Sequence, residues 1–135
     1  MKFLGFDGKE YSTTLVVKKR GKVSKNHERA RQLLKTLFPM EQVFEEVTLL
    51  GSKTDKNKTL YADFYIHSKS LMLEIQGSQH EQYNSFFHAN KLEFLKAKIR
   101  DKTKERWCEI NGIVLIQLPE KENNDEWTKR INSRE

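Results

Sequence analysis

The sequence predicts an α/β fold in which a mixed β-sheet is flanked by helices and preceded by a β-hairpin. Three observations support this prediction. Runs rich in β-branched and aromatic residues follow one another in the middle of the chain, two segments carry apolar residues at helical spacing, and an apolar run follows the second of these segments. Consecutive strands favour antiparallel pairing, whereas a strand reached through a long helix favours a parallel partner.

Length and composition indicate one domain. The chain has 135 residues, of which 36% are hydrophobic and 33% charged, enough for one core beneath a large charged surface. We divide it into an N-terminal hairpin with a basic loop (residues 1–23), a core (residues 24–118) and a C-terminal helix (residues 119–135).

The N-terminal part is expected to contain the hairpin and the first helix. Residues 3–17 read as two strands that turn at Asp7-Gly8, a pair typical of tight hairpin turns. After the basic loop, Ser24 is a suitable N-cap for a helix that ends before Pro39.

The middle of the chain predicts three consecutive strands. They cover residues 41–50, 60–66 and 71–76. The polar segment 51–59 separates the first two as an exposed loop, and residues 67–70 form a short turn between the last two.

The C-terminal part predicts a long helix, a strand and a short helix. The helix covers about residues 91–110 and ends at Asn111-Gly112, the strand covers residues 113–118, and the last helix buries Trp127 and Ile131. The stripe of the long helix that we expect to face the core consists of Leu92, Leu95, Ile99, Thr103, Trp107 and Ile110.

The charge distribution predicts a polyanionic partner. Lys and Arg number 25 against 19 Asp and Glu, a formal net charge of +6, and nucleic acid is the usual partner of such a protein. Two basic runs are the candidate phosphate contacts. The first comprises Lys18, Lys19, Arg20, Lys22 and Lys25, and the second includes Lys98, Arg100, Lys102 and Lys104.

Other sequence features predict where the protein acts. No apolar run is long enough to span a bilayer, and the N-terminus lacks the apolar core of a signal peptide. The single cysteine, Cys108, fits a reducing compartment. We therefore expect a cytoplasmic protein without a membrane partner.

Two carboxylates in neighbouring apolar strands are the main candidate site. Asp63 and Glu74 each stand in a run that otherwise predicts a buried strand, where an uncompensated charge is costly. A divalent cation between them would offset both charges, and carboxylate oxygens suit Mg²⁺ or Mn²⁺. The alternative is that Asp63 lies at a sheet edge and that Glu74 pairs with a lysine across the sheet.

The residues after Glu74 extend this candidate site. Gln76 shares a strand face with Glu74 because side chains alternate, so it can orient a water molecule or a phosphate oxygen. His80 follows in a loop and is suited to act as a general base. The alternative for His80 is a loop residue without a role.

A resemblance to a nuclease superfamily rests on these residues. LYADFYI, LEIQGSQH and RDKTKERWCEINGIVLIQL resemble the PD-(D/E)XK superfamily, and more closely its branch of very-short-patch-repair endonucleases and phage-type homing endonucleases. The resemblance covers residues 24–118. It implies a restriction-endonuclease-like core, in which a helix, three or four strands of mixed direction and a second helix surround the site.

The resemblance also implies roles for the site residues. Asp63 would be the principal ligand of Mg²⁺ and Glu74 the second acidic position. Gln76 stands where many members carry the catalytic lysine, and His80 would supply the base. Asp101 and Lys104 fall on one side of the long helix, and from this position we expect Asp101 to orient His80, in keeping with the family pattern, and Lys104 to contact a phosphate. The alternative for Asp101 and Lys104 is an ion pair within one helix.

The first helix offers one more candidate. Members of this branch often have a glutamate there that faces the site, which favours Glu28, whereas helical phase places His27 toward the sheet. The alternative is that Glu28 pairs with Arg31 and that His27 is a packed residue at the start of the helix.

The resulting prediction is a metal-dependent endonuclease that hydrolyses phosphodiester bonds of double-stranded DNA in a bacterial or phage-infected host cell. Two other functions stay open. One is a DNA-binding module of the same fold whose site has decayed at Gln76, and the other is a structure-selective junction resolvase or an RNase. The sequence also leaves open whether the protein is a monomer or a homodimer and whether it cuts one strand or both.

Overall fold

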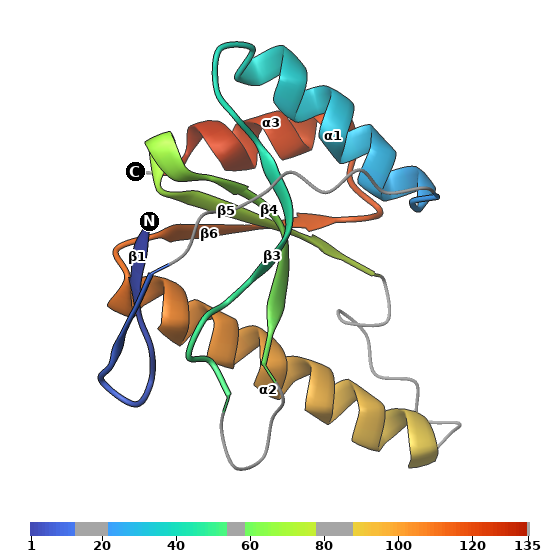
Figure 1. Ribbon diagram of the computed structural model, residues 1–135. Coiled ribbons are helices and arrows are strands. Elements are labelled where there is room, and N and C mark those ends of the chain that lie inside the picture. Colours follow the sequence, from blue (N-terminus) through green and yellow to red (C-terminus); the bar gives the residue numbers. More distant parts are fainter. Residues whose placement is uncertain (13–21, 54–58, 78–87, 135) are drawn as a thin grey trace.

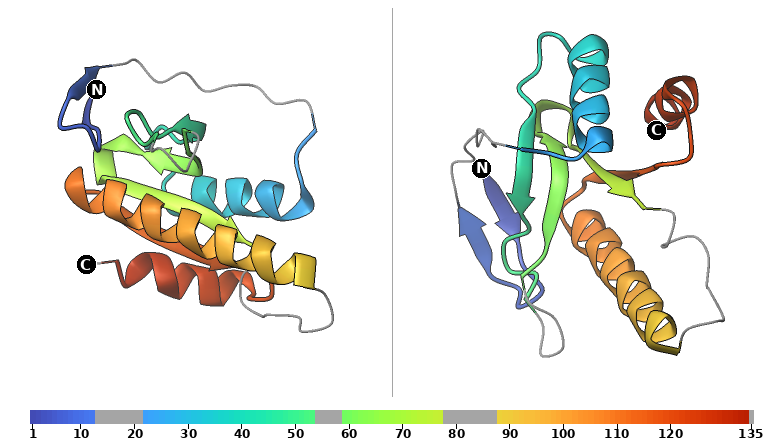
Figure 2. Two further views of the ribbon diagram at one scale, coloured as in Figure 1. Left: turned by 90° about the horizontal axis from the view of Figure 1, so that it is seen from below. Right: turned by 90° about the vertical axis from the view of Figure 1, so that its right-hand side faces the viewer.

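A four-stranded mixed sheet with helices on both faces forms the body of the protein (Figure 1). The structure is a computed structural model that describes residues 1–12, 22–53, 59–77 and 88–134. Helices α1 (Lys25–Leu37) and α3 (Asn124–Asn132) cover one face, and α2 (His88–Ile110) covers the other (Figures 1 and 2). In the described part of the chain, no helix is long and apolar enough to cross a membrane.

The N-terminal hairpin is confirmed. Strands β1 (Lys2–Leu4) and β2 (Glu10–Ser12) pair antiparallel and form a small sheet of their own. Gly8 has a φ of +78°, a left-handed conformation that glycine adopts without a steric penalty. The remainder of the predicted hairpin, residues 13–17, lies outside the described residues.

The first helix begins and ends where the sequence predicts. The Ser24 hydroxyl accepts a hydrogen bond from the His27 amide over 3.1 Å, which satisfies one of the free amides at the helix start. Ala30 and Leu34 are buried against the sheet, and Phe38 caps the end before Pro39.

The main sheet has the order β3-β4-β5-β6. Its strands are β3 (Phe44–Thr48), β4 (Tyr61–Ile66), β5 (Leu71–Gln76) and β6 (Val114–Pro119). The first three pair antiparallel, and β6 pairs parallel to β5, as the long crossover helix requires. A short 3₁₀ turn, η1 (His67–Lys69), joins β4 to β5, and Ser70 behind it adopts a left-handed conformation.

The phase of α2 differs from the prediction. Trp107 is buried as expected, but most of the predicted stripe is exposed, namely Leu92, Leu95, Ile99 and Ile110. Asp101 and Lys104 instead reach the sheet, together with the buried Ala97 and Cys108. The prediction was wrong because it assumed an apolar surface beneath the whole helix, whereas the sheet presents Glu74 and Gln76 there.

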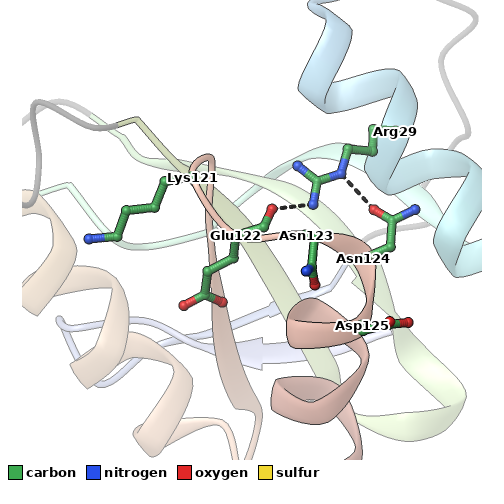
Figure 3. A pocket seen from close by; sticks show the side chains of 6 residues that line it. All are labelled: Arg29, Lys121, Glu122, Asn123, Asn124 and Asp125. Atoms are coloured by element: carbon green, nitrogen blue, oxygen red, sulfur yellow. Dashed lines mark hydrogen bonds between the residues drawn. The ribbon is translucent and has the colours of Figure 1, made fainter.

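The C-terminal helix is confirmed and is fastened to the rest of the molecule at its start. Trp127 and Ile131 are fully buried, and the Trp127 indole donates a hydrogen bond to the Pro119 carbonyl over 2.8 Å. The guanidinium of Arg29 on α1 lies 3.5 Å from the centre of the Trp127 ring. It also donates a hydrogen bond to the Asn124 side chain (Figure 3). Arg29 therefore links α1 to α3.

Replacing Trp127 tests this packing. Trp127→Ala should lower the free energy of unfolding by about 3–5 kcal/mol, because it leaves a cavity between α3 and the sheet. Urea denaturation measures the change. Met40→Ala is the matched control because Met40 is 91% exposed. Equal losses in the two variants would contradict the packing described here.

Candidate functional site

The site lies where β4 and β5 stop pairing. The last paired positions at this end are Phe64 and Leu73, and one further step of the same register sets Asp63 opposite Glu74. The two carboxylates therefore occupy opposing positions of the two strands. Figure 1 shows the two strands diverging beyond this point.

Asp63 connects β4 and β5 at the point where they stop pairing, here called the fork. Its Oδ2 accepts a hydrogen bond from the backbone amide of Ile75 over 2.9 Å. The Asp63 carboxylate therefore bonds to β5 just beyond the last paired backbone positions of the two strands, Phe64 and Leu73. Asp63 keeps β5 within reach of β4 and is itself oriented by the strand that carries Glu74.

Glu74 is a buried carboxylate with an ammonium beside it. The Lys104 Nζ of α2 lies 2.9 Å from Glu74 Oε2, and the two side chains are only 15% and 13% exposed. Burial raises the pKa of Glu74 to about 7; the charges of Asp63 and Asp101 also raise it, whereas Lys104 lowers it. Asp63 and Glu74 are therefore close enough to repel each other.

Gln76 and Asp101 continue the site toward the start of α2. The Gln76 amide nitrogen lies 3.5 Å from Asp101 Oδ2. Gln76 and Glu74 both contact α2, which confirms that they share one face of β5. Asp101 was predicted to orient His80, which lies outside the described residues, so that role stays a prediction.

His27 and Glu28 belong to a separate cluster around Glu45 on β3. His27 is buried, its Nε2 lies 2.7 Å from Glu45 Oε1, and its ring stacks on Phe64 with centroids 4.5 Å apart. Glu28 accepts hydrogen bonds from Arg31 over 2.6 Å and from Gln32 over 2.8 Å. These contacts lie within α1 and between α1 and β3, as expected if Glu28 pairs with Arg31 and His27 is a packed residue at the start of the helix. The structure therefore brings neither residue to Asp63 and Glu74.

Sequence reasoning missed Glu45. Burial opposes its charge, but hydrogen bonds from Arg31 and His27 outweigh burial and hold the pKa of Glu45 below its usual value. Arg31 binds both carboxylate oxygens, over 2.9 and 2.7 Å. The sequence carries no signal for this contact, because it depends on the register of β3 against α1.

Sequence reasoning also missed Gln117 and the partner of Lys104. Gln117 lies beside Glu74 in the parallel register of β5 and β6. It is the single polar residue of the run IVLIQL, and that contrast was the available signal. Lys104 was predicted to contact a phosphate, but here it pairs with Glu74, so the lysine partner considered for Glu74 comes from α2 and not from the sheet.

The other basic candidates are distributed over two regions. Lys98, Arg100 and Lys102 are exposed on α2, and Lys22 and Lys25 are exposed near the start of α1. Lys18, Lys19 and Arg20 lie outside the described residues. The exposed residues are accessible to a polyanion, as their predicted role requires.

The donor set of the site fits a hard divalent cation. Mg²⁺ in proteins commonly keeps several water ligands and binds through one or two carboxylates together with substrate phosphates. Asp63 and Glu74 provide two such carboxylates at neighbouring strand positions. Among the residues that the structure describes, no group of three or more His, Cys, Asp or Glu side chains is arranged to hold a metal. Asp63 and Glu74 are the two residues that would hold such an ion.

Three viral proteins are similar to this chain. Uncharacterized protein 033L of Invertebrate iridescent virus 3 is 32% identical over 96 residues, which are 71% of this chain and 49% of that protein. Uncharacterized protein 094L of Frog virus 3 (isolate Goorha) is 35% identical over 78 residues, 56% of this chain and 50% of that protein. Uncharacterized protein 307L of Invertebrate iridescent virus 6 is 36% identical over 63 residues, which are 47% of this chain and 32% of that protein.

The chain spans half or less of the length of these curated relatives. No protein-family model matches it, and no solved structure matches it.

The pH dependence of stability tests the environment of Glu74. Because the pKa of Glu74 is raised from 4.5 to about 7, the folded state holds a proton that the unfolded state releases between these values. Stability should therefore fall as pH rises from about 4.5 to 7, by roughly 3 kcal/mol for this group. Urea denaturation in a chelating buffer measures the slope.

Glu74→Gln removes the titrating group and should flatten this slope. Only the pH slopes of the two proteins are compared, and not their absolute stabilities, because the substitution also removes the ion-pair partner of Lys104. Identical slopes for the variant and the wild type would show that Glu74 is not the buried titrating group.

Proposed function

We propose that this protein is a metal-dependent endonuclease that hydrolyses phosphodiester bonds in double-stranded DNA. The observation that carries the proposal is the pair of Asp63 and Glu74 at the fork of β4 and β5. A stable protein has little reason to place two carboxylates side by side on the covered face of its sheet, since their repulsion and burial are unfavourable.

The topology supports this proposal. A helix, three antiparallel strands, a crossover helix and a parallel strand follow one another. A helix, strands of mixed direction and a second helix are the elements that the resemblance to the PD-(D/E)XK superfamily implies. Asp63 lies on the second of the antiparallel strands and Glu74 and Gln76 on the third. The restriction-endonuclease-like core is therefore part of the proposal.

In the proposed reaction, Asp63 and Glu74 would hold a Mg²⁺ ion. That ion would supply electrophilic activation of the phosphate and would lower the pKa of a water molecule. The Ile75 amide fixes the orientation of Asp63. Gln76, close to Asp101, positions the water molecule or a phosphate oxygen. Lys104 supplies a positive charge that offsets the negative charge developing on the phosphate. His80 accepts the proton of the attacking water.

Binding of the DNA backbone is assigned to the exposed basic residues. Lys98, Arg100 and Lys102 lie on α2, the helix that also carries Lys104 to the site, so a duplex contacting them passes near Glu74. The viral relatives support an infected cell as the setting, and a cytoplasmic location is part of the proposal.

Cleavage of supercoiled plasmid in Mg²⁺ or Mn²⁺ tests the proposal. Asp63→Asn should lower the cleavage rate about 100-fold or more, because it removes a metal ligand and its charge. Asp125→Asn is the matched control, since Asp125 is an exposed acid on α3. Its cleavage rate should equal that of the wild type.

Other substrates separate the alternatives. Linear duplex, a four-way junction and RNA should be compared with the plasmid under the same conditions. Preference for the junction or for RNA would replace the proposal by a resolvase or an RNase. A wild type that binds DNA but leaves every substrate intact would identify a binding module.

A further inference from the structure

Lys104 occupies an unusual place for a lysine. Lysine side chains are rarely buried because their ammonium is strongly hydrated, yet Lys104 is only 15% exposed beneath α2. On the same helix, Leu92, Leu95 and Ile99 are exposed. The orientation of α2 about its axis therefore buries Lys104 and leaves these three apolar side chains exposed.

The surroundings of Lys104 are acidic. Its Nζ contacts Glu74 over 2.9 Å, and the charges of Asp63 and Asp101 both act on Glu74. The ammonium of Lys104 offsets part of this negative charge in the protein as folded.

We infer that Lys104 is an internal counter-ion of the site, which a divalent cation displaces from Glu74 when it binds. The inference rests on the proposed metal site formed by Asp63 and Glu74. A divalent cation at Glu74 and the Lys104 ammonium would repel each other at short range, so binding of the cation weakens the Lys104–Glu74 contact. Metal binding thus releases the Lys104 ammonium for a phosphate oxygen of the substrate.

The helix can release this side chain without moving. Trp107 and Cys108, one turn further along α2, are buried, and the Trp107 indole donates to the Leu50 carbonyl over 2.8 Å. The flexible four-carbon stem of lysine allows the ammonium to swing while the helix remains packed.

Titration of Mn²⁺ into the protein without DNA tests the exchange. Lys104→Gln should bind Mn²⁺ roughly tenfold more tightly than the wild type by calorimetry, because the competing cation is gone. Lys104→Arg keeps a cation and should bind close to the wild-type affinity. Lys91→Gln is the matched control, since it removes an exposed charge from the same helix. Its affinity should also stay close to that of the wild type.

A second measurement needs no substitution. In Mg²⁺ titrations of the wild type with ¹³C-labelled lysine, the side-chain signal of Lys104 should shift with the binding curve while that of Lys102 stays in place. Unchanged Mn²⁺ affinity in Lys104→Gln, or a Lys104 signal that does not move while Mg²⁺ binds, overturns the exchange but leaves the metal site intact. If the wild type binds neither metal, the proposed metal site fails and the exchange fails with it.

Discussion

The hydrogen bond from the Ile75 amide to the Asp63 carboxylate is the contact on which the candidate site depends. It lies where β4 and β5 stop pairing, and it ties a side chain of one strand to the backbone of the other. With the fork held in this way, Asp63 and Glu74 stand opposite each other and Gln76 reaches α2. A small change in the register of these strands would separate the carboxylates, because a shift of one residue turns side chains to the other face.

The polar fork also determines how α2 packs. A helix over an apolar sheet would bury its leucines, but Glu74 needs a cation and Gln76 needs a polar partner. Lys104 and Asp101 therefore reach the sheet, and Leu92, Leu95 and Ile99 are exposed. Only the end of the helix, with Trp107 and Cys108, follows the usual hydrophobic phase. The C-terminal end of α2 thus packs in the hydrophobic core, whereas its middle contributes polar side chains to the candidate site.

The other face of the sheet provides the stable support for this arrangement. There α1 and α3 pack on β4, β5 and β6 through an apolar cluster that includes Phe64, Leu73 and Trp127. The buried Glu45 on that side is fully compensated by Arg31 and His27, in contrast to Glu74. One buried carboxylate is thus held as a structural ion pair, whereas the other keeps a raised pKa beside a second acid. Only the second arrangement leaves a charge imbalance that a divalent cation would relieve.

The sequence by itself determined the elements, because each has a local cause. Asp7-Gly8 specifies a turn, Ser24 caps α1, and runs of β-branched and aromatic residues give β4 and β5 close to their observed bounds. It also singled out Asp63, Glu74 and Gln76 as polar residues in apolar strands. The tertiary structure decided which charges meet. The pairing of Lys104 with Glu74 and of Glu45 with Arg31 depends on helix phase and strand register between segments distant in the chain. Apolar periodicity gave the wrong phase for α2, since it does not encode the polarity of the surface beneath a helix.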